Sequence, residues 1–195
     1  MNLQLLPINE VIFMNFSVDK ITFSDHKKKT YQSPWAALLW SIAIPGFGQF
    51  YNRDYFLGLL LIGWEVLVNL QANVNESIWY SFNGELYKAY EVSDLSWGLF
   101  YPAVFCYSIW QAFNKALKMN VENSVEGENI LLRPHLTGFF FGMTIGMDFG
   151  LIWSFFISPV FSGLSLGLIL GYIGHQIEKG ILRKKGIEDE RINRI

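Results

Sequence analysis

The sequence contains little cysteine and little charge. Cys106 is the single cysteine among 195 residues, which excludes an intramolecular disulfide framework and a cysteine-rich zinc site. Charged residues make up 16% of the chain, against about 25% in soluble domains. Hydrophobic residues make up 51%, which excludes a disordered chain because disorder needs low hydrophobicity and high charge. The net charge of −2 lacks the basic excess of a nucleic-acid-binding protein.

Charge is absent from three long stretches, residues 30–52, 95–114 and 149–176. Each approaches or exceeds the roughly 20 residues that a helix needs to cross about 30 Å of hydrocarbon. These stretches are apolar on nearly every side, whereas a soluble helix keeps a polar face. We therefore expect an all-α, polytopic integral membrane protein with four to five membrane-embedded helices and the lipid bilayer as its surroundings. The predicted segments are 34–50, 55–70, 95–113, 136–156 and 159–177.

The predicted segments divide the chain into seven parts. The first half consists of an extramembrane segment with a basic flank (1–33), a kinked membrane hairpin (34–70) and an acidic connection (71–94). The second half consists of a membrane helix (95–113), a polar connection (114–135), a second hairpin (136–177) and a basic-rich tail (178–195).

The distribution of basic residues leaves two topologies open. Five full crossings place 5 basic residues on the N-terminal side of the membrane and 10 on the C-terminal side. One re-entrant or merged segment among the first two leaves four crossings and brings 13 basic residues to one side. The positive-inside rule favours a cytoplasmic position for 114–135 and for the tail in both cases. We expect the bacterial cytoplasmic (inner) membrane, and the side of the N-terminus stays open.

The most distinctive local pattern joins the first two segments. A proline removes a backbone donor, and two nearby glycines permit unusual dihedral angles or close backbone approach. Gln49, Tyr51 and Asn52 are expected to bring polar groups to the membrane boundary. The pattern resembles the P-G-x-G-x-F-Y hairpin of the two-transmembrane-helix domain family, over about residues 33–70. The matching residues are Pro45, Gly46, Gly48, Phe50, Tyr51 and Gly58.

The resemblance is incomplete after the tyrosine. This chain has Asn52-Arg53-Asp54 where many members of the family have a glycine. The resemblance implies an accessory membrane module and implies no catalytic residue.

Glycine recurs at every fourth position in two later segments. In water each glycine weakens a helix by about 1 kcal/mol relative to alanine, but in lipid small residues let helix backbones approach closely. We therefore expect a C-terminal glycine-zipper helical hairpin, joined by a short turn at Ser158-Pro159. The alternative is that each stripe packs against another subunit. The stripes consist of Gly138, Gly142, Gly146 and Gly150, followed by Gly163, Gly167 and Gly171.

Glu65, Asp148 and His175 are candidate intramembrane polar sites, because ionisable groups within membrane segments are often functional. Glu65 could pair with Arg53 or Lys88, or form a protonated, hydrogen-bonded structural group. Asp148 points roughly 140° away from the mean glycine direction. It should therefore face the first half of the protein, a partner or a polar cavity. His175 lies near the opposite end of the last segment, where an interfacial position is the alternative.

Sequence patterns of enzymes are not supported by their context. The string Gly163-x-Ser165-x-Gly167 matches a hydrolase motif, but no strand-to-helix turn is expected there. Ser165 and His175 would lie about 15 Å apart along one helix. We expect no catalytic residue, no metal and no cofactor. The sequence favours a non-enzymatic membrane scaffold or accessory subunit, with a membrane-protein partner or a second copy of the chain. The alternative is a small transporter or channel component that uses the intramembrane acids.

Overall fold

The structure is a computed structural model that describes residues 31–124, 133–154 and 157–184. Within these ranges the chain is all-helical and contains no strand, which confirms the all-α class. The basic flank at 27–29 and most of the basic tail lie outside the described residues, as does the middle of the 114–135 connection. The helices in chain order are α1 (Pro34–Ala43), α2 (Phe47–Tyr51), α3 (Tyr55–Ala72), α4 (Val74–Phe82), α5 (Leu86–Val92), α6 (Leu95–Gly98), α7 (Tyr101–Ser124), α8 (Thr137–Ile152) and α9 (Pro159–Lys184).

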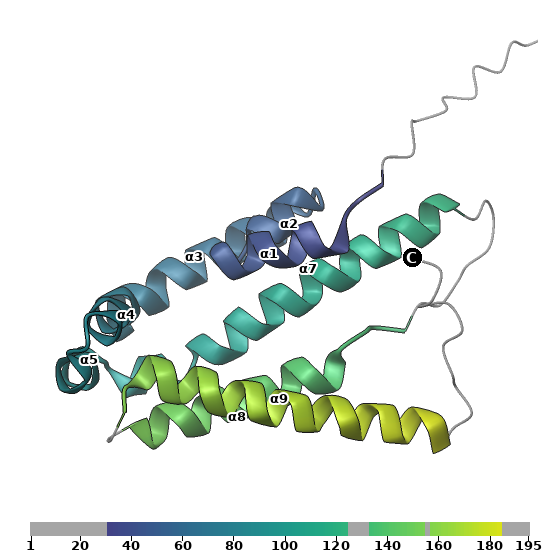
Figure 1. Cartoon of the computed structure of the whole chain (residues 1–195). Coiled ribbons are helices and arrows are strands. Elements are labelled where there is room, and N and C mark those ends of the chain that lie inside the picture. Colours follow the sequence, from purple (N-terminus) through teal and green to yellow (C-terminus); the bar gives the residue numbers. More distant parts are fainter. Residues whose placement is uncertain (1–30, 125–132, 155–156, 185–195) are drawn as a thin grey trace, which may run out of the picture.

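The longer helices share one long axis, and α4 and α5 lie across one end of it (Figure 1). Helix α7 is central: α1, α2 and α3 contact it from one side and α8 contacts it from the other. Helix α9 packs along α8 in the opposite direction. Both α1 and α7 use small side chains where they meet, at Ala37, Ala112 and Ala116. On the other side of α7, Cys106 and Ile109 pack against Phe140, Met143 and Met147 of α8.

The first predicted segment is not one helix. Ser33 caps α1 by accepting a hydrogen bond from the Ala36 N–H at 3.3 Å, and the helix ends after ten residues. Pro45 follows without a backbone donor, and Gly46 adopts a positive φ of 105°, which glycine reaches at little steric cost. Helix α2 then runs back toward the end where α1 began (Figure 1). The start of α1 and the end of α2 therefore lie at the same end of the molecule, where the Ser33 N–H donates to the Tyr51 hydroxyl at 3.1 Å.

Two other predicted boundaries also differ from the structure. The 71–94 connection is largely helical, since it contains α4 and α5. Asn73 takes a left-handed conformation at the point where α3 ends and α4 begins. The predicted 95–113 helix is interrupted between α6 and α7. Helix α7 then continues to Ser124, well beyond the predicted end, with Lys115 and Lys118 in its second half.

Two described helices, α3 and α9, are long and apolar enough to span a membrane, fewer than the four to five that the sequence predicted. Helices α1 and α8 are shorter, and the second half of α7 is polar. Only 22% of the most apolar stretch of α3 and of α9 is buried, whereas a core helix of a soluble protein is covered on most sides. Their apolar side chains therefore face outward.

The four glycines of the α8 stripe face the backbone of α9. A Cβ atom built on any of them would come closer than 3.0 Å to a carbonyl oxygen of α9. The facing carbonyls belong to Gly174, Leu170, Leu166 and Ser162. Contacts in the α9 stripe vary: a Cβ on Gly163 would lie 3.6 Å from the nearest atom, the Met147 carbonyl oxygen, whereas a Cβ on Gly167 would lie 2.6 Å from the Met147 side chain. Close approach of the two helices therefore depends on the four α8 glycines and on Gly174 of α9, whose Cβ would overlap the Gly138 carbonyl oxygen.

We expect Gly142→Ala to lower the thermal stability of the detergent-solubilised protein. The added methyl group would collide with the Leu170 carbonyl, and overpacking of this kind costs about 1–3 kcal/mol. Gly163→Ala is the matched control, because its methyl group would make an ordinary contact and should leave the melting temperature nearly unchanged. Equal melting temperatures for the two variants would contradict the tight α8–α9 contact.

Candidate functional site: a polar cluster on helix α7

The turn between α1 and α2 is held by helix α7. The backbone N–H of Gly46 donates to the Ser108 hydroxyl at 3.1 Å, in a position where both residues are buried. Pro45 has no N–H that needs a partner. Buried backbone donors almost always find an acceptor, because an unpaired one costs free energy. The Ser108 hydroxyl therefore supplies the hydrogen-bond acceptor that the Gly46 N–H needs where the helix is broken.

Gln49 lies at the centre of this contact and is fully buried. Its side-chain nitrogen donates to the Ser108 carbonyl and to the Gln111 side-chain oxygen, both at 2.8 Å. Its side-chain oxygen accepts from the hydroxyls of Ser108 at 3.3 Å and Ser41 at 3.5 Å. The amide thus uses both donors and two acceptor positions. We call Gln49, Ser41, Ser108 and Gln111 the Gln49 cluster.

Asn52 and Asp54 extend the Gln49 cluster toward the end of the molecule. The Asn52 side chain donates to the Ala112 carbonyl of α7 at 2.7 Å, and its own oxygen is buried without a hydrogen-bond partner. Gln111 donates to the Asp54 carboxylate at 3.3 Å. Helix α7 covers the side chains of Gln49 and Asn52, so both are buried inside the protein. Asn52 and Asp54, on either side of Arg53, thus each make a hydrogen bond with α7.

Each glycine of the hairpin pattern stands at a close contact. A Cβ on Gly48 would overlap the Ala37 carbonyl and the Ser41 hydroxyl. Gly46 and Gly58 face each other, since a Cβ on Gly58 would lie 3.0 Å from the Gly46 carbonyl oxygen. The Phe50 ring packs over Gly58. These glycines let α1, α2 and α3 pack tightly enough to cover the turn.

Glu65 faces α7, where the Tyr101 side chain is its hydrogen-bond partner. The structure shows Tyr101 here in place of either basic residue considered from the sequence, Arg53 or Lys88. One oxygen of the carboxyl group, Oε2, is buried without a hydrogen-bond partner. The Glu65 carboxyl group is therefore only partly satisfied by hydrogen bonds.

Asp148 and His175 are not brought together with Glu65. Asp148 lies on α8 near the Cys106 thiol of α7, and His175 lies on α9. The Asp148 Oδ1 and His175 Nδ1 atoms are both buried without a hydrogen-bond partner. Ser165 shares the unbroken helix α9 with His175, ten residues away. In the described part of the chain, no group of three or more His, Cys, Asp or Glu side chains could hold a metal ion.

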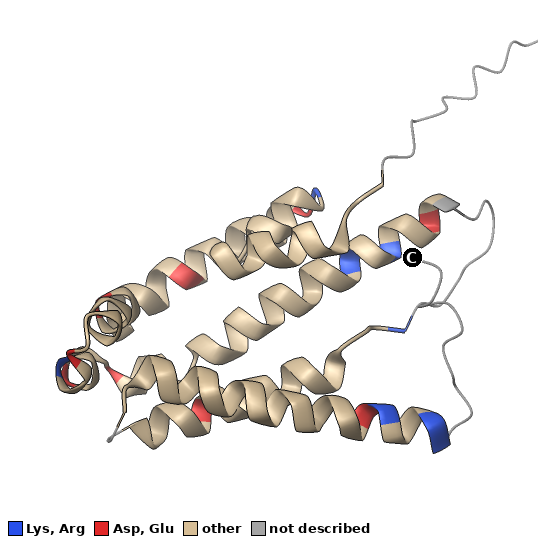
Figure 2. Cartoon of the chain, viewed as in Figure 1, with Lys and Arg blue, Asp and Glu red and all other residues tan. Residues whose placement is uncertain are grey.

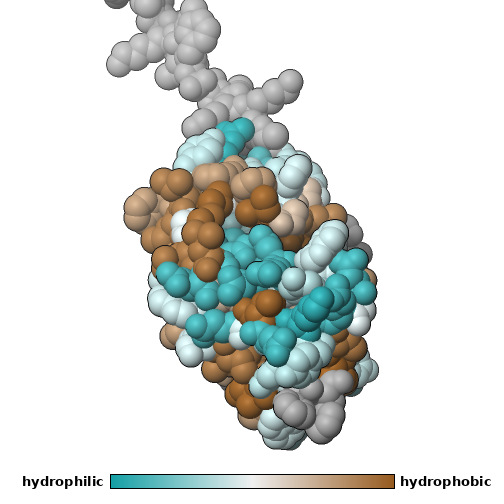
Figure 3. Space-filling view, turned by 90° about the vertical axis from the view of Figure 1, so that its left-hand side faces the viewer, coloured by the Kyte–Doolittle hydropathy of each residue, from teal (hydrophilic) through white to brown (hydrophobic). Residues whose placement is uncertain are grey.

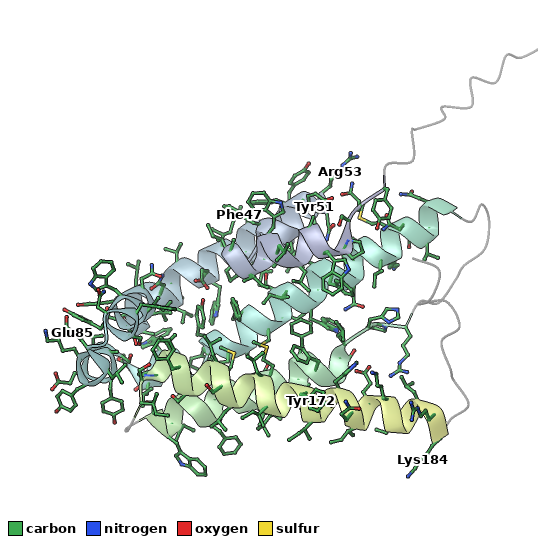
Figure 4. The ribbon with its side chains drawn as sticks, viewed as in Figure 1. Phe47, Tyr51, Arg53, Glu85, Tyr172 and Lys184 are labelled. Carbon is green, nitrogen blue, oxygen red and sulfur yellow. The ribbon has the colours of Figure 1, made fainter. Side chains whose placement is uncertain are left out.

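Charges gather at the two ends of the long axis (Figure 2). Acidic residues predominate at the α4–α5 end, where Lys88 forms an exposed ion pair with Glu85. The hydrogen bond to the Glu85 carboxylate raises the pKa of Lys88. Basic residues predominate at the opposite end, on α7, on α9 and beside α2. Figure 4 accordingly shows Arg53 and Lys184 at one end and Glu85 at the other.

Two side chains that sequence reasoning missed hold the start of α8. The Asn114 side chain of α7 accepts from the His135 N–H at 2.6 Å and donates to the His135 carbonyl at 3.1 Å. Glu178 of α9 accepts from the Gly138 N–H at 2.9 Å and pairs with Arg133 at 3.3 Å. A carboxylate at a helix N-terminus also interacts favourably with the positive end of the helix dipole. The isolated acid among basic residues of α9 was the one sequence signal available.

Comparison of the chain with protein-family models, with curated proteins and with solved structures found no match.

We expect Gln49→Leu to destabilise the protein by about 1–3 kcal/mol, because buried groups on Ser108 and Gln111 would lose their partner. Thermal unfolding in detergent measures this change. Gln71→Leu is the matched control, since Gln71 is exposed on α3 and the variant should unfold near the wild-type temperature. If Gln49→Leu is as stable as Gln71→Leu, the Gln49 cluster does not hold α2 on α7.

Proposed function

We propose that this chain is an integral membrane protein with four crossings, formed by α3, α7, α8 and α9. Helices α1 and α2, with ten and five residues, form a re-entrant pair that is too short to cross. Re-entrant backbone is tolerated in a membrane only where protein or water covers it. The contacts of Gly46 and Gln49 with Ser108 supply that cover.

Surface polarity supports this orientation of the long axis across the bilayer. Figure 3, a view onto the α4–α5 end, shows a band of hydrophilic residues across that end with hydrophobic residues above and below. Exposed apolar side chains continue along the sides of α3, α8 and α9. Contiguous apolar surface of this extent is rare on soluble monomers. Among the exposed apolar residues are Phe56, Leu59, Leu60, Leu70, Phe141, Leu168, Ile169 and Ile177.

The proposed topology removes the conflict in the charge counts. In this proposal α1 and α2 return to the side of the membrane where they began. The same side then holds residues 1–33, Arg53, the 114–135 connection and the tail. Every basic residue except Lys88 then falls on one side, which the positive-inside rule assigns to the cytoplasm. The acidic α4–α5 segment lies outside. This arrangement favours the bacterial cytoplasmic membrane as the location.

Within that membrane we propose a non-enzymatic scaffold or accessory subunit. The observation that carries this proposal is the use of buried polar groups: Gln49, Asn52 and Ser108 join one helix to another. The resemblance to the two-transmembrane-helix domain family belongs to the same proposal, since Gly46, Gly48 and Gly58 serve helix packing. An exposed stripe on α3 is free to meet a membrane-protein partner or a second copy. It comprises Phe56, Leu59, Leu60, Gly63, Leu67 and Leu70.

A small transporter or channel component is the second candidate. The unpartnered buried oxygens of Glu65 and Asp148 favour it, because such groups in membrane helices can bind a proton or a cation.

Cysteine accessibility in intact cells tests the topology. In a Cys106→Ala background, cysteines replacing the exposed residues Tyr31, Tyr55 and Lys184 should react from the cytoplasmic side, because α1 and α2 return to it. A cysteine replacing exposed Glu76 should react from outside. Opposite sides for positions 31 and 55 would overturn the re-entrant pair in favour of five crossings.

Photo-crosslinking combined with ion flux separates the two functions. A photoreactive residue at Leu60 should form a reproducible protein adduct in native membranes, because a partner helix covers the α3 stripe. The same group at Leu168 of α9 is the matched control and should form lipid adducts. Proteoliposomes containing the purified chain should then show no flux of protons or monovalent cations. Flux that is abolished by Asp148→Asn, together with only lipid adducts at Leu60 and Leu168, would contradict the scaffold proposal and support a transporter.

A further inference from the structure

We infer that the groove between α7 and α8 binds one anionic phospholipid, with an acyl chain in the groove and the headgroup at the basic end of the molecule. This inference rests on the membrane placement proposed above. It names a lipid as a specific ligand in addition to the bulk bilayer that surrounds the helices.

The groove has the size and lining of an acyl-chain site. Its volume is about 230 Å³, and it is open toward the outside of the helix pair. A helix with its side chains is about 10–12 Å wide, so a partner helix could insert a side chain but could not enter. The lining is largely apolar and aromatic, and consists of Ala103, Cys106, Tyr107, Trp110, Phe140 and Phe141, with Thr137 and Thr144.

The polar atoms of four lining residues, Cys106, Trp110, Thr137 and Thr144, are engaged within the protein. Thr144 donates to the Phe140 carbonyl at 2.9 Å, and the Cys106 thiol lies 3.9 Å from the Met147 sulfur. The Trp110 indole N–H donates to the Thr137 hydroxyl at 3.3 Å. An occupant therefore needs no hydrogen-bonding group, which suits hydrocarbon.

Basic side chains lie beyond one end of the groove. Trp110 is the last α7 residue of the lining, and Asn114, one turn further along α7, holds the backbone of His135. This contact holds His135 against α7, and Arg133 stands two residues before it in the chain. Lys118 follows Asn114 by one more turn and is exposed.

These cations are available to a phosphate group. Arg133 uses one guanidinium nitrogen for Glu178, and Arg carries five N–H donors in all. Lys118 is paired with Glu122 at 3.6 Å in the open, where an ion pair contributes little and can be exchanged. Tyr107 and Trp110 line the groove, and Trp and Tyr side chains are enriched near membrane interfaces. Charge complementarity thus selects a phospholipid with a net negative headgroup.

Native mass spectrometry of the purified full-length chain tests this inference. The protein is titrated with phosphatidylglycerol or with phosphatidylcholine of the same acyl chains. We expect one phosphatidylglycerol to bind before any further lipid, and phosphatidylcholine to bind more weakly. Lys118→Gln should reduce the affinity for phosphatidylglycerol about fivefold and leave the affinity for phosphatidylcholine unchanged.

A filled groove provides the second arm. Ala103→Trp places an indole in the groove and should weaken both lipids about tenfold, the factor expected when roughly two methylene groups lose their contacts. Leu168→Trp, on the exposed face of α9, is the matched control and should bind as the wild type does. Wild-type binding by Ala103→Trp, equal affinities for the two lipids, or a protein adduct from a photoreactive group at Ala103 would each overturn the inference.

The outcome is separable from that of the proposed function. Membrane insertion of each variant is measured by its resistance to alkaline extraction and by the cysteine positions described above. A chain that is extracted fails as a membrane protein. A chain that inserts normally, but in which Ala103→Trp leaves lipid binding unchanged, fails only as a binder of a specific lipid.

Discussion

The fold depends on satisfying a broken backbone inside an apolar protein. Between α1 and α2 the helical hydrogen-bond ladder stops, and no solvent is available there to replace it. The Ser108 hydroxyl accepts from the Gly46 N–H. The Gln49 side-chain amide donates two hydrogen bonds to α7 and accepts from hydroxyls on α7 and α1. These contacts hold α2 where it turns back against α7 and α1. Helix α3 then starts from the end of the molecule where α1 began.

The two sides of α7 use different physical means of helix contact. Toward α1 and α2 the helix presents hydrogen-bonding groups, because the turn it covers has polar backbone to satisfy. Toward α8 it presents Cys106 and Ile109, which pack against two methionines and Phe140. The α8–α9 contact depends on neither, since glycines let the two backbones touch. Membrane helices lack a hydrophobic driving force between them, so polar bonds and close packing must supply the association.

Local features of the sequence predicted much of this. The charge-free stretches indicated apolar helices, and the spacing of Gly142 and Gly146 indicated a face that approaches another backbone. Pro45 and Gly46 indicated the break. The lengths of the segments were predicted less well, because α7 continues through polar residues that do not interrupt a helix. The partners of Glu65 and of the α8 N-terminus were missed, because they lie on helices distant in sequence.

The sequence by itself therefore determined the class of fold, the ends of several helices and the glycines that need close approach, because these depend on residues a few positions apart. Only the tertiary structure decided that the start of α1 and the end of α2 lie at the same end of the molecule, that Tyr101 is the partner of Glu65, and that each α8 glycine faces a carbonyl group of α9. The reason is physical. A side chain fixes its own turn of helix, but its hydrogen-bond partner across a helix interface is set by how whole helices pack.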